Sequence, residues 1–133
     1  MSCKKGKDCC GNKDCASQVS VGPVVKDEPP PTPNDQPSVW LAIINDMVPD
    51  AGNAPLIRDM KERHALGIAR YKMPLQPFNG RNQLVDLYQE LLDGTAYARS
   101  WRMEGNVDSF FIYETCLSMA ATVRRLLTEQ GHP

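Results

Sequence analysis

Acidic side chains recur on one face of a helical stretch in the middle of the chain. Asp86, Glu90 and Asp93 are spaced i, i+4 and i+7, which places them within about 60° of arc on a helix. Like charges at this spacing repel, and no lysine or arginine lies between them. Asp59 and Glu62, spaced i and i+3, form a second co-facial pair in the preceding helical stretch. Carboxylates from two helices suit Mg²⁺ or Mn²⁺, hard cations that take oxygen ligands and join substrate phosphates.

The loop between the two acidic stretches, residues 72–80, carries groups of a complementary kind. Two prolines there exclude both a helix and a central strand. The loop and its edges offer three cations for phosphate oxygens, an amide and an aromatic ring for stacking: Arg70, Lys72, Arg81, Asn79 and Phe78. On composition alone the loop can equally be a connector and the carboxylates a solvated face, so both interpretations stay open.

Four amphipathic stretches must position these residues. Apolar side chains recur every three or four positions and predict helices over residues 39–47, 55–71, 84–102 and 110–127. No alternating strand pattern of four or more residues occurs, so the expected fold is an all-α four-helix bundle spanning residues 38–133. Short helices with wide apolar faces often need a partner chain, which predicts an oligomer. His64 lies within an apolar stripe and is interpreted as a core or interface histidine.

Residues 1–37 have a different composition and predict a flexible tail. Cys3, Cys9, Cys10 and Cys15 are mixed with lysines, and their spacing suits neither a zinc site nor a disulfide framework. Six of the eleven prolines follow before residue 38, which favours a stiff, extended linker. The sequence therefore divides into a Cys- and Pro-rich tail and one helical domain.

Charge and hydropathy bear on the class of partner. The 133 residues hold 15 basic and 16 acidic side chains, a net charge of −1, without the basic excess that nucleic acids or anionic membranes attract. The longest uncharged apolar run, residues 39–44, is too short for a membrane span or a signal peptide. We expect a cytoplasmic protein with no nucleic-acid or membrane partner.

A family resemblance is carried by residues 67–93, GIARYKMPLQPFNGRNQLVDLYQELLD. This run closely resembles the phage-type, single-domain MazG-like proteins, which belong to the all-α nucleoside triphosphate pyrophosphohydrolases. The metal signature of that family is Glu-x-x-Glu on one helix and Glu-x-x-Asp on the next. Glu90 to Asp93 matches the second half, whereas Asp59 to Glu62 matches the first half only with Asp in place of the leading Glu.

The resemblance implies cleavage between the α- and β-phosphates of an NTP or dNTP, releasing the nucleoside monophosphate and pyrophosphate. It implies roughly two or three Mg²⁺ or Mn²⁺ ions held by Asp59, Glu62, Asp86, Glu90 and Asp93, which would lower the pKa of a bound water for in-line attack. Glu62 or Asp59 is the expected catalytic base, and the loop cations would neutralise the triphosphate.

The resemblance also implies a homodimer or homotetramer in which Trp40, Phe110 or Glu114 of a neighbour contributes to the site. A purine dNTP, dATP or dGTP, is the first expectation for the substrate, and the host cytoplasm is the location if a phage encodes the chain. The alternative from a different class is a non-catalytic helical interaction protein whose acidic face docks a basic partner.

Overall fold

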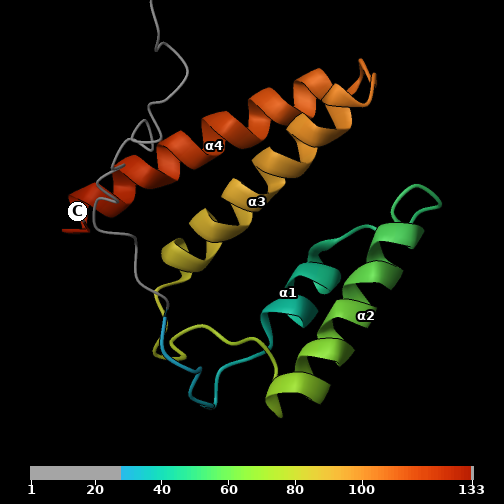
Figure 1. The fold of residues 1–133 in the computed structure, drawn as a ribbon. Coiled ribbons are helices and arrows are strands. Elements are labelled where there is room, and N and C mark those ends of the chain that lie inside the picture. Colours follow the sequence, from blue (N-terminus) through green and yellow to red (C-terminus); the bar gives the residue numbers. More distant parts are fainter. Residues whose placement is uncertain (1–27, 133) are drawn as a thin grey trace, which may run out of the picture.

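The computed structural model describes residues 28–132, which are helical and without strands (Figure 1). The helices are α1, Val39–Asp46, α2, Ala54–Tyr71, α3, Gln83–Met103, and α4, Ser109–Glu129. The all-α expectation is confirmed, and each helix ends within two residues of the predicted bounds. The cysteines at positions 3 to 15 and the rest of residues 1–27 lie outside the described range.

Local sequence signals account for where the helices begin. The Ser38 side chain caps α1 by accepting a hydrogen bond from the Leu41 N–H, and the Asn82 side chain caps α3 by accepting one from the Leu84 N–H. Pro55 lies in the first turn of α2, where its missing N–H costs nothing. The loop of residues 72–82 therefore connects the end of α2 at Tyr71 to the start of α3, which Asn82 caps.

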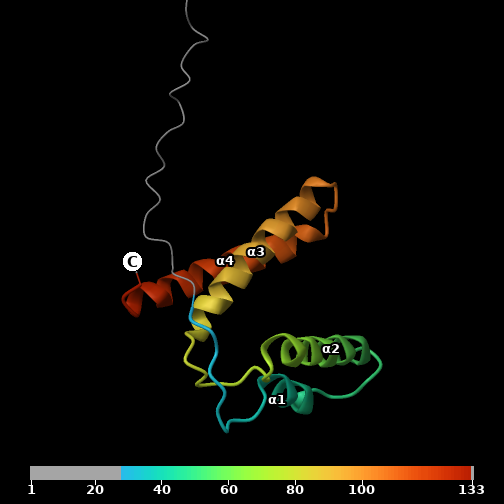
Figure 2. The same cartoon turned by 60° about the horizontal axis from the view of Figure 1, so that its bottom comes forward.

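The helices pack as two separate pairs, α1 with α2 and α3 with α4. Figures 1 and 2 show the two pairs joined through the loop and diverging from it. Within residues 28–132 no helix of one pair contacts a helix of the other. The chain by itself therefore does not close a four-helix bundle.

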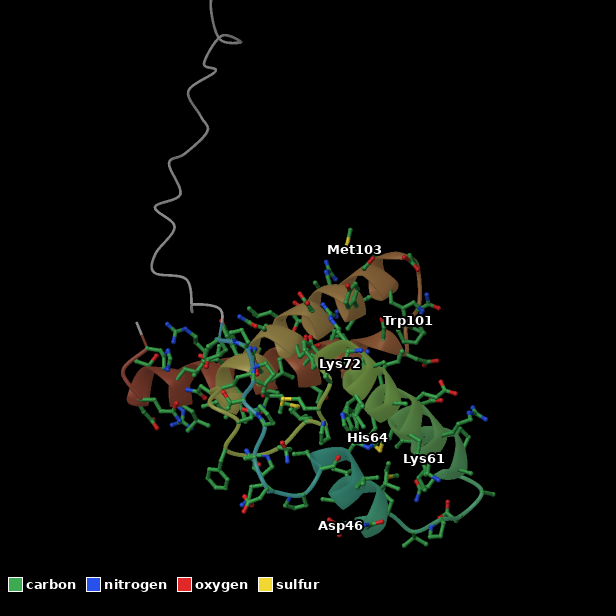
Figure 3. All side chains as sticks on the ribbon, turned by 90° about the horizontal axis from the view of Figure 1, so that it is seen from below. Asp46, Lys61, His64, Lys72, Trp101 and Met103 are labelled. Carbon is green, nitrogen blue, oxygen red and sulfur yellow. The ribbon has the colours of Figure 1, made fainter. Side chains whose placement is uncertain are left out.

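The hydrophobic core is small and lies between α3 and α4. Val85, Val123 and Leu127 are buried, with Leu84, Tyr88 and Leu91 packed against them. Many large apolar side chains are instead exposed, including Tyr97, Trp101, Met103, Val107, Phe110 and Phe111 along the far half of the α3–α4 pair. Figure 3 shows Trp101 and Met103 at that end. Several large exposed apolar side chains at one end of a helix pair are typical of an interface rather than a free face.

Residues 28–36, called the strap below, lie against the loop in an extended path (Figure 1). The Thr32 N–H donates to the Asn79 carbonyl at 2.8 Å. The buried Gln76 side chain accepts from the Asn34 N–H and donates to the Asn34 and Gln36 carbonyls at 2.8 and 2.5 Å. The strap thus departs from the expected flexible tail. Its backbone groups are hydrogen-bonded to the Asn79 carbonyl and the Gln76 side chain, and composition alone does not predict these partners.

None of the helices formed by residues 28–132 combines the length and the apolar character that a bilayer crossing needs.

Candidate functional site

A large open cavity lies between the two helix pairs. Its volume is about 1090 Å³, and its walls come from α2, the loop, the first half of α3 and single residues of α1 and the strap. Ligand-binding clefts commonly measure 300 to 1,000 Å³, so this space holds a molecule of at least nucleotide size. Five of the ten candidate residues line the cavity: Arg70, Asn79, Arg81, Asp86 and Glu90.

The α3 wall carries the acidic residues that the sequence singled out. Asp86 and Glu90 line the cavity, and Asp93 follows one turn later on the same face of α3. Glu90 and Asp93 are exposed, whereas Asp86 is half-buried. The helical prediction for this face is therefore confirmed, and two of its three carboxylates reach the cavity.

The α2 wall is basic where it meets the cavity. Arg63 and Arg70 line it, together with His64, whose Nδ1 lies 3.4 Å from the Ser38 hydroxyl. Asp59 stands one turn before Arg63 on the same side of the helix, and Glu62 is adjacent. Both carboxylates are exposed and neither lines the cavity.

The two acidic sets do not come together in the described chain. Since α2 and α3 are not in contact, no three carboxylates, histidines or cysteines of residues 28–132 gather closely enough to hold one metal ion. Mg²⁺ and Mn²⁺ need several oxygen ligands at short range, so the chain in this arrangement does not fit the expected metal cluster. α2 and α3 each supply only some of the oxygen ligands that Mg²⁺ or Mn²⁺ would need.

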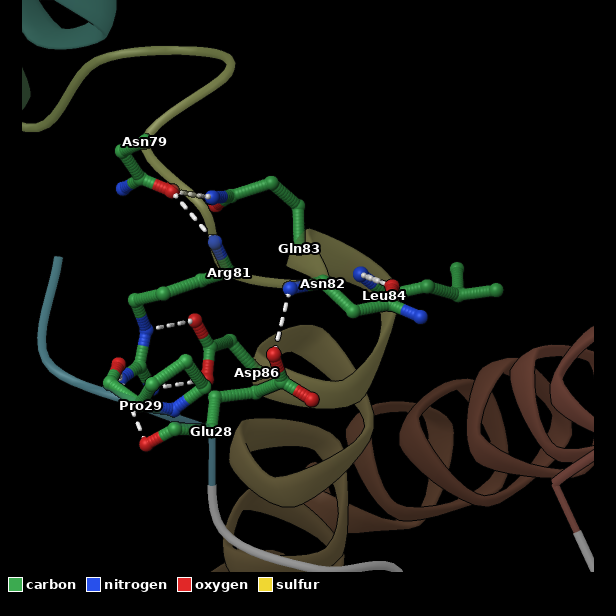
Figure 4. Close-up of polar contacts among 8 residues, drawn as sticks. All are labelled: Glu28, Pro29, Asn79, Arg81, Asn82, Gln83, Leu84 and Asp86. Carbon is green, nitrogen blue, oxygen red and sulfur yellow. Dashed lines mark hydrogen bonds and ion pairs between the residues drawn. The ribbon is translucent and has the colours of Figure 1, made fainter. Parts of the chain in front are cut away.

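Arg81 and Asp86 are bonded to each other rather than to open solvent (Figure 4). Arg81 Nε donates to Asp86 Oδ2 at 2.8 Å, and Nη2 donates to Oδ1 at 2.5 Å. The hydrogen bond with Asp86 raises the pKa of Arg81; burial opposes it, and the charges of Asp86 and Glu28 add to it. Arg81 was expected to bind phosphate and Asp86 to bind metal. In the structure they instead form one ion pair with two hydrogen bonds.

Asn79 is the most enclosed polar residue of the loop. Its side chain is fully buried, and Oδ1 accepts from the Arg81 N–H at 3.1 Å and from Gln83 Nε2 at 3.0 Å (Figure 4). These two bonds determine the orientation of the amide, and Nδ2 is left without a partner among residues 28–132. Such an unpaired buried donor costs about 1–3 kcal/mol.

Lys72 and Phe78 share an unusual backbone but stand away from the cavity. Both have positive φ angles, 61° and 55°. Lys72 ends α2, and its ammonium donates to the Ala69 carbonyl at 2.9 Å. The Phe78 side chain is 87% exposed. Neither residue lines the cavity, so the structure does not bring them to the other candidate ligands.

Several polar or aromatic lining residues were not predicted from the sequence as ligands of this chain, among them Trp40, Arg63 and Gln83. Trp40 of α1 reaches the cavity from its own chain, where the resemblance suggested a neighbour's copy. Arg63 and Gln83 also line it. For Arg63 the available signal was helical spacing, because Arg63 lies seven residues before Arg70 on α2. Gln83 had no such signal, because α3 begins at that residue.

No protein-family model, curated protein or solved structure matches this chain. The function proposed below therefore rests on the size of the cavity and on the charged residues that line it.

Proposed function

We propose that this chain is a metal-dependent nucleotide pyrophosphohydrolase, which takes an NTP or dNTP into the cavity and releases the monophosphate and pyrophosphate. The observation that carries this proposal is the wall of the cavity, in which Arg63 and Arg70 of α2 stand across from Asp86 and Glu90 of α3. Arginines suit phosphate oxygens, and carboxylates suit the divalent cation that accompanies a triphosphate. A purine deoxynucleotide from the cytoplasmic pool is the first substrate to test.

The nucleoside would lie toward α1 and the loop. Trp40 offers an aromatic face for the base. Arg70 would meet phosphates from the end of α2. Arg81 would hold the first turn of α3 in place through Asp86.

The metal ligands would be completed by a movement or by a second chain. Asp59 lies one turn before Arg63 on α2, Glu62 is adjacent to Arg63, and Asp93 continues the acidic face of α3. Bringing the two faces together would add Asp59 and Glu62 to Glu90 and Asp93 as oxygen donors for Mg²⁺ or Mn²⁺, whereas Asp86 stays paired with Arg81. The exposed apolar side chains at the far end of the α3–α4 pair support a homodimer or homotetramer, because a second chain packed there would remove them from water.

One observation favours the alternative function. The carboxylates of α2 and α3 remain separate in the described chain, as in a surface that docks a basic partner without chemistry. A metal-dependent reaction separates the two proposals.

The test is release of pyrophosphate from a panel of dNTPs and NTPs with Mn²⁺, with Mg²⁺ and with chelator. Glu90→Gln should lower turnover at least about 100-fold without changing the melting temperature, because Glu90 is exposed and makes no structural bond that its amide would lose. Glu104→Gln is the matched control, as Glu104 caps α3 outside the cavity. Absence of metal-dependent release from every nucleotide would favour the docking protein.

A further inference from the structure

The orientation of the Gln83 carboxamide is determined by a chain of hydrogen bonds that starts at a backbone group (Figure 4). The Arg81 N–H can only donate, so the Asn79 atom that lies 3.1 Å from it is the acceptor Oδ1. The Gln83 atom that lies 3.0 Å from the same Oδ1 is in turn the donor Nε2. Gln83 therefore cannot exchange the places of its oxygen and nitrogen without losing a hydrogen bond to a buried residue.

Gln83 keeps one acceptor and one donor for a ligand. The residue is exposed and lines the cavity. Its Oε1 accepts no hydrogen bond from residues 28–132, and its Nε2 has a second hydrogen besides the one given to Asn79. The cavity wall at Gln83 thus carries an acceptor and a donor in a fixed arrangement.

Gln83 lies at the same end of the cavity as Trp40. The Val39 N–H donates to the Leu75 carbonyl at 2.9 Å, so α1 begins beside the loop, and α3 begins directly after the loop. Glu90 follows Gln83 by seven residues on the same face of α3, a rise of about 10 Å. This separation is comparable with the length of a nucleoside monophosphate. A base stacked on Trp40 would therefore have its edge near Gln83 when its phosphates lie near Glu90.

We propose that Gln83 determines base specificity by accepting a hydrogen bond from an amino group of the base, and that the substrate is an adenine nucleotide. Adenine has an amino donor at position 6 with a ring-nitrogen acceptor on either side, which matches the acceptor and donor of Gln83 from both edges. Guanine and hypoxanthine have a carbonyl oxygen at position 6, which would face Oε1 as a second acceptor. This inference rests on the proposed function, since it names the base of the nucleotide that the cavity takes.

Asn79 acts in this proposal as a positioning residue. Its Oδ1 holds Gln83 Nε2, and this bond prevents the carboxamide from turning its donor toward a carbonyl oxygen of the wrong base. A glutamine without such a partner could rotate and bind either kind of base equally well. The preference for adenine therefore depends on both residues.

The experiment compares dATP with dITP, which carry an amino group and a carbonyl oxygen, respectively, at position 6. Calorimetry with the full chain and a chelator measures binding without turnover. The wild type should bind dATP at least roughly tenfold more tightly than dITP, the scale of one two-point contact to a base. Equal binding of the two, or tighter binding of dITP or dGTP, would overturn the assignment.

Gln83→Met keeps the length of the side chain but removes both polar atoms, so its affinity for dATP should fall to that for dITP. Gln36→Met is the matched control, because Gln36 is exposed, lies outside the cavity and bonds through its side chain to Asp35. Its ratio of dATP to dITP affinity should equal that of the wild type. An unchanged ratio in Gln83→Met would show that another group recognises the base.

Asn79→Leu tests the positioning role. The change removes the acceptor for Gln83 Nε2, so the carboxamide can rotate, and dITP binding should tighten while dATP binding changes little. Equal weakening of both nucleotides would exclude the positioning role, because a purely structural effect does not depend on the base.

The base assignment and the proposed function fail separately. Preferential binding of dATP without release of pyrophosphate in Mn²⁺ or Mg²⁺ would refute the enzymatic function alone. Hydrolysis of dATP and dITP with equal affinities would refute the role of Gln83 alone, and absence of binding by either nucleotide would overturn both.

Discussion

Arg81 and Asp86 face each other across the first turn of α3, five residues apart, as a two-point ion pair with bonds of 2.8 and 2.5 Å. Their side chains are 23% and 29% exposed, so the pair is partly shielded from solvent. It joins the loop to α3 at the point where the strap arrives. A catalytic interpretation of either residue must therefore include the other.

Breaking this pair should destabilise the fold. Asp86→Asn removes the charge from two hydrogen bonds, and we expect a loss of about 2 kcal/mol in the free energy of unfolding, measured by urea denaturation. Because the pKa of Arg81 is raised, its stabilising charge is present below that value and is lost only at strongly alkaline pH. The loss should therefore stay constant from mildly acid to mildly alkaline solution.

The control for that measurement is the pair Arg125 and Glu129 on α4. It has a short bond of 2.6 Å, but its side chains are 64% and 58% exposed. Arg125→Ala should cost no more than about 0.5 kcal/mol, as exposed i, i+4 pairs do. Equal costs at the two sites would contradict the structural role given to Arg81.

The strap should detach when its anchor is removed. Gln76→Met keeps the size of the buried side chain but removes its bonds to the Asn34 and Gln36 backbone. We expect hydrogen exchange at the Asn34 amide to accelerate at least roughly tenfold, the scale of one or more lost hydrogen bonds. Asn34 protection equal to that of the wild type would show that Gln76 does not hold the strap.

Phe78 is held in a backbone conformation that its side chain does not favour. Asn tolerates φ near 55° better than Phe does, and the exposed ring makes no packing contact that the change would lose. Phe78→Asn should raise the free energy of unfolding by about 0.5–1 kcal/mol. Phe78→Leu keeps the strain and should leave stability nearly unchanged, so a gain in both variants would exclude backbone strain as the cause.

Trp40 should contribute to nucleotide binding but not to polyphosphate binding. Stacking of a base on an aromatic ring is worth about 1–3 kcal/mol, so Trp40→Leu should weaken binding of a dNTP by roughly tenfold or more. Its affinity for tripolyphosphate should not change, because that ligand has no base. Calorimetry with both ligands checks this, and equal losses would indicate that Trp40 shapes the cavity instead.

Self-association should depend on the apolar end of the α3–α4 pair. Phe111 is 76% exposed, and Phe111→Asp would place a charge in the interface that we propose there. Sedimentation velocity should show a dimer or tetramer for the wild type and a smaller species for the variant. Lys61→Asp, on exposed α2 surface, is the control and should keep the oligomer; a monomeric wild type would refute the proposed assembly.

The sequence by itself determined the helices and the acidic faces. Apolar spacing, caps and prolines act within a few residues, so they predicted α1 to α4, the intervening loop and the shared face of Asp86, Glu90 and Asp93. The exposed position of the Phe78 ring could not be predicted from these local patterns. Phe78 has a positive φ angle, and this conformation depends on the path of the whole loop.

Only the tertiary structure decided which groups are partners. Arg81 bonds to Asp86 because the loop turns back on α3, and helical spacing does not relate a loop residue to a helix residue five positions later. The strap reaches Asn82 across 54 positions, a contact that its proline-rich composition gives no reason to expect. The separation of the two acidic sets follows from how the two helix pairs diverge, which depends on long-range packing and not on the period of either helix.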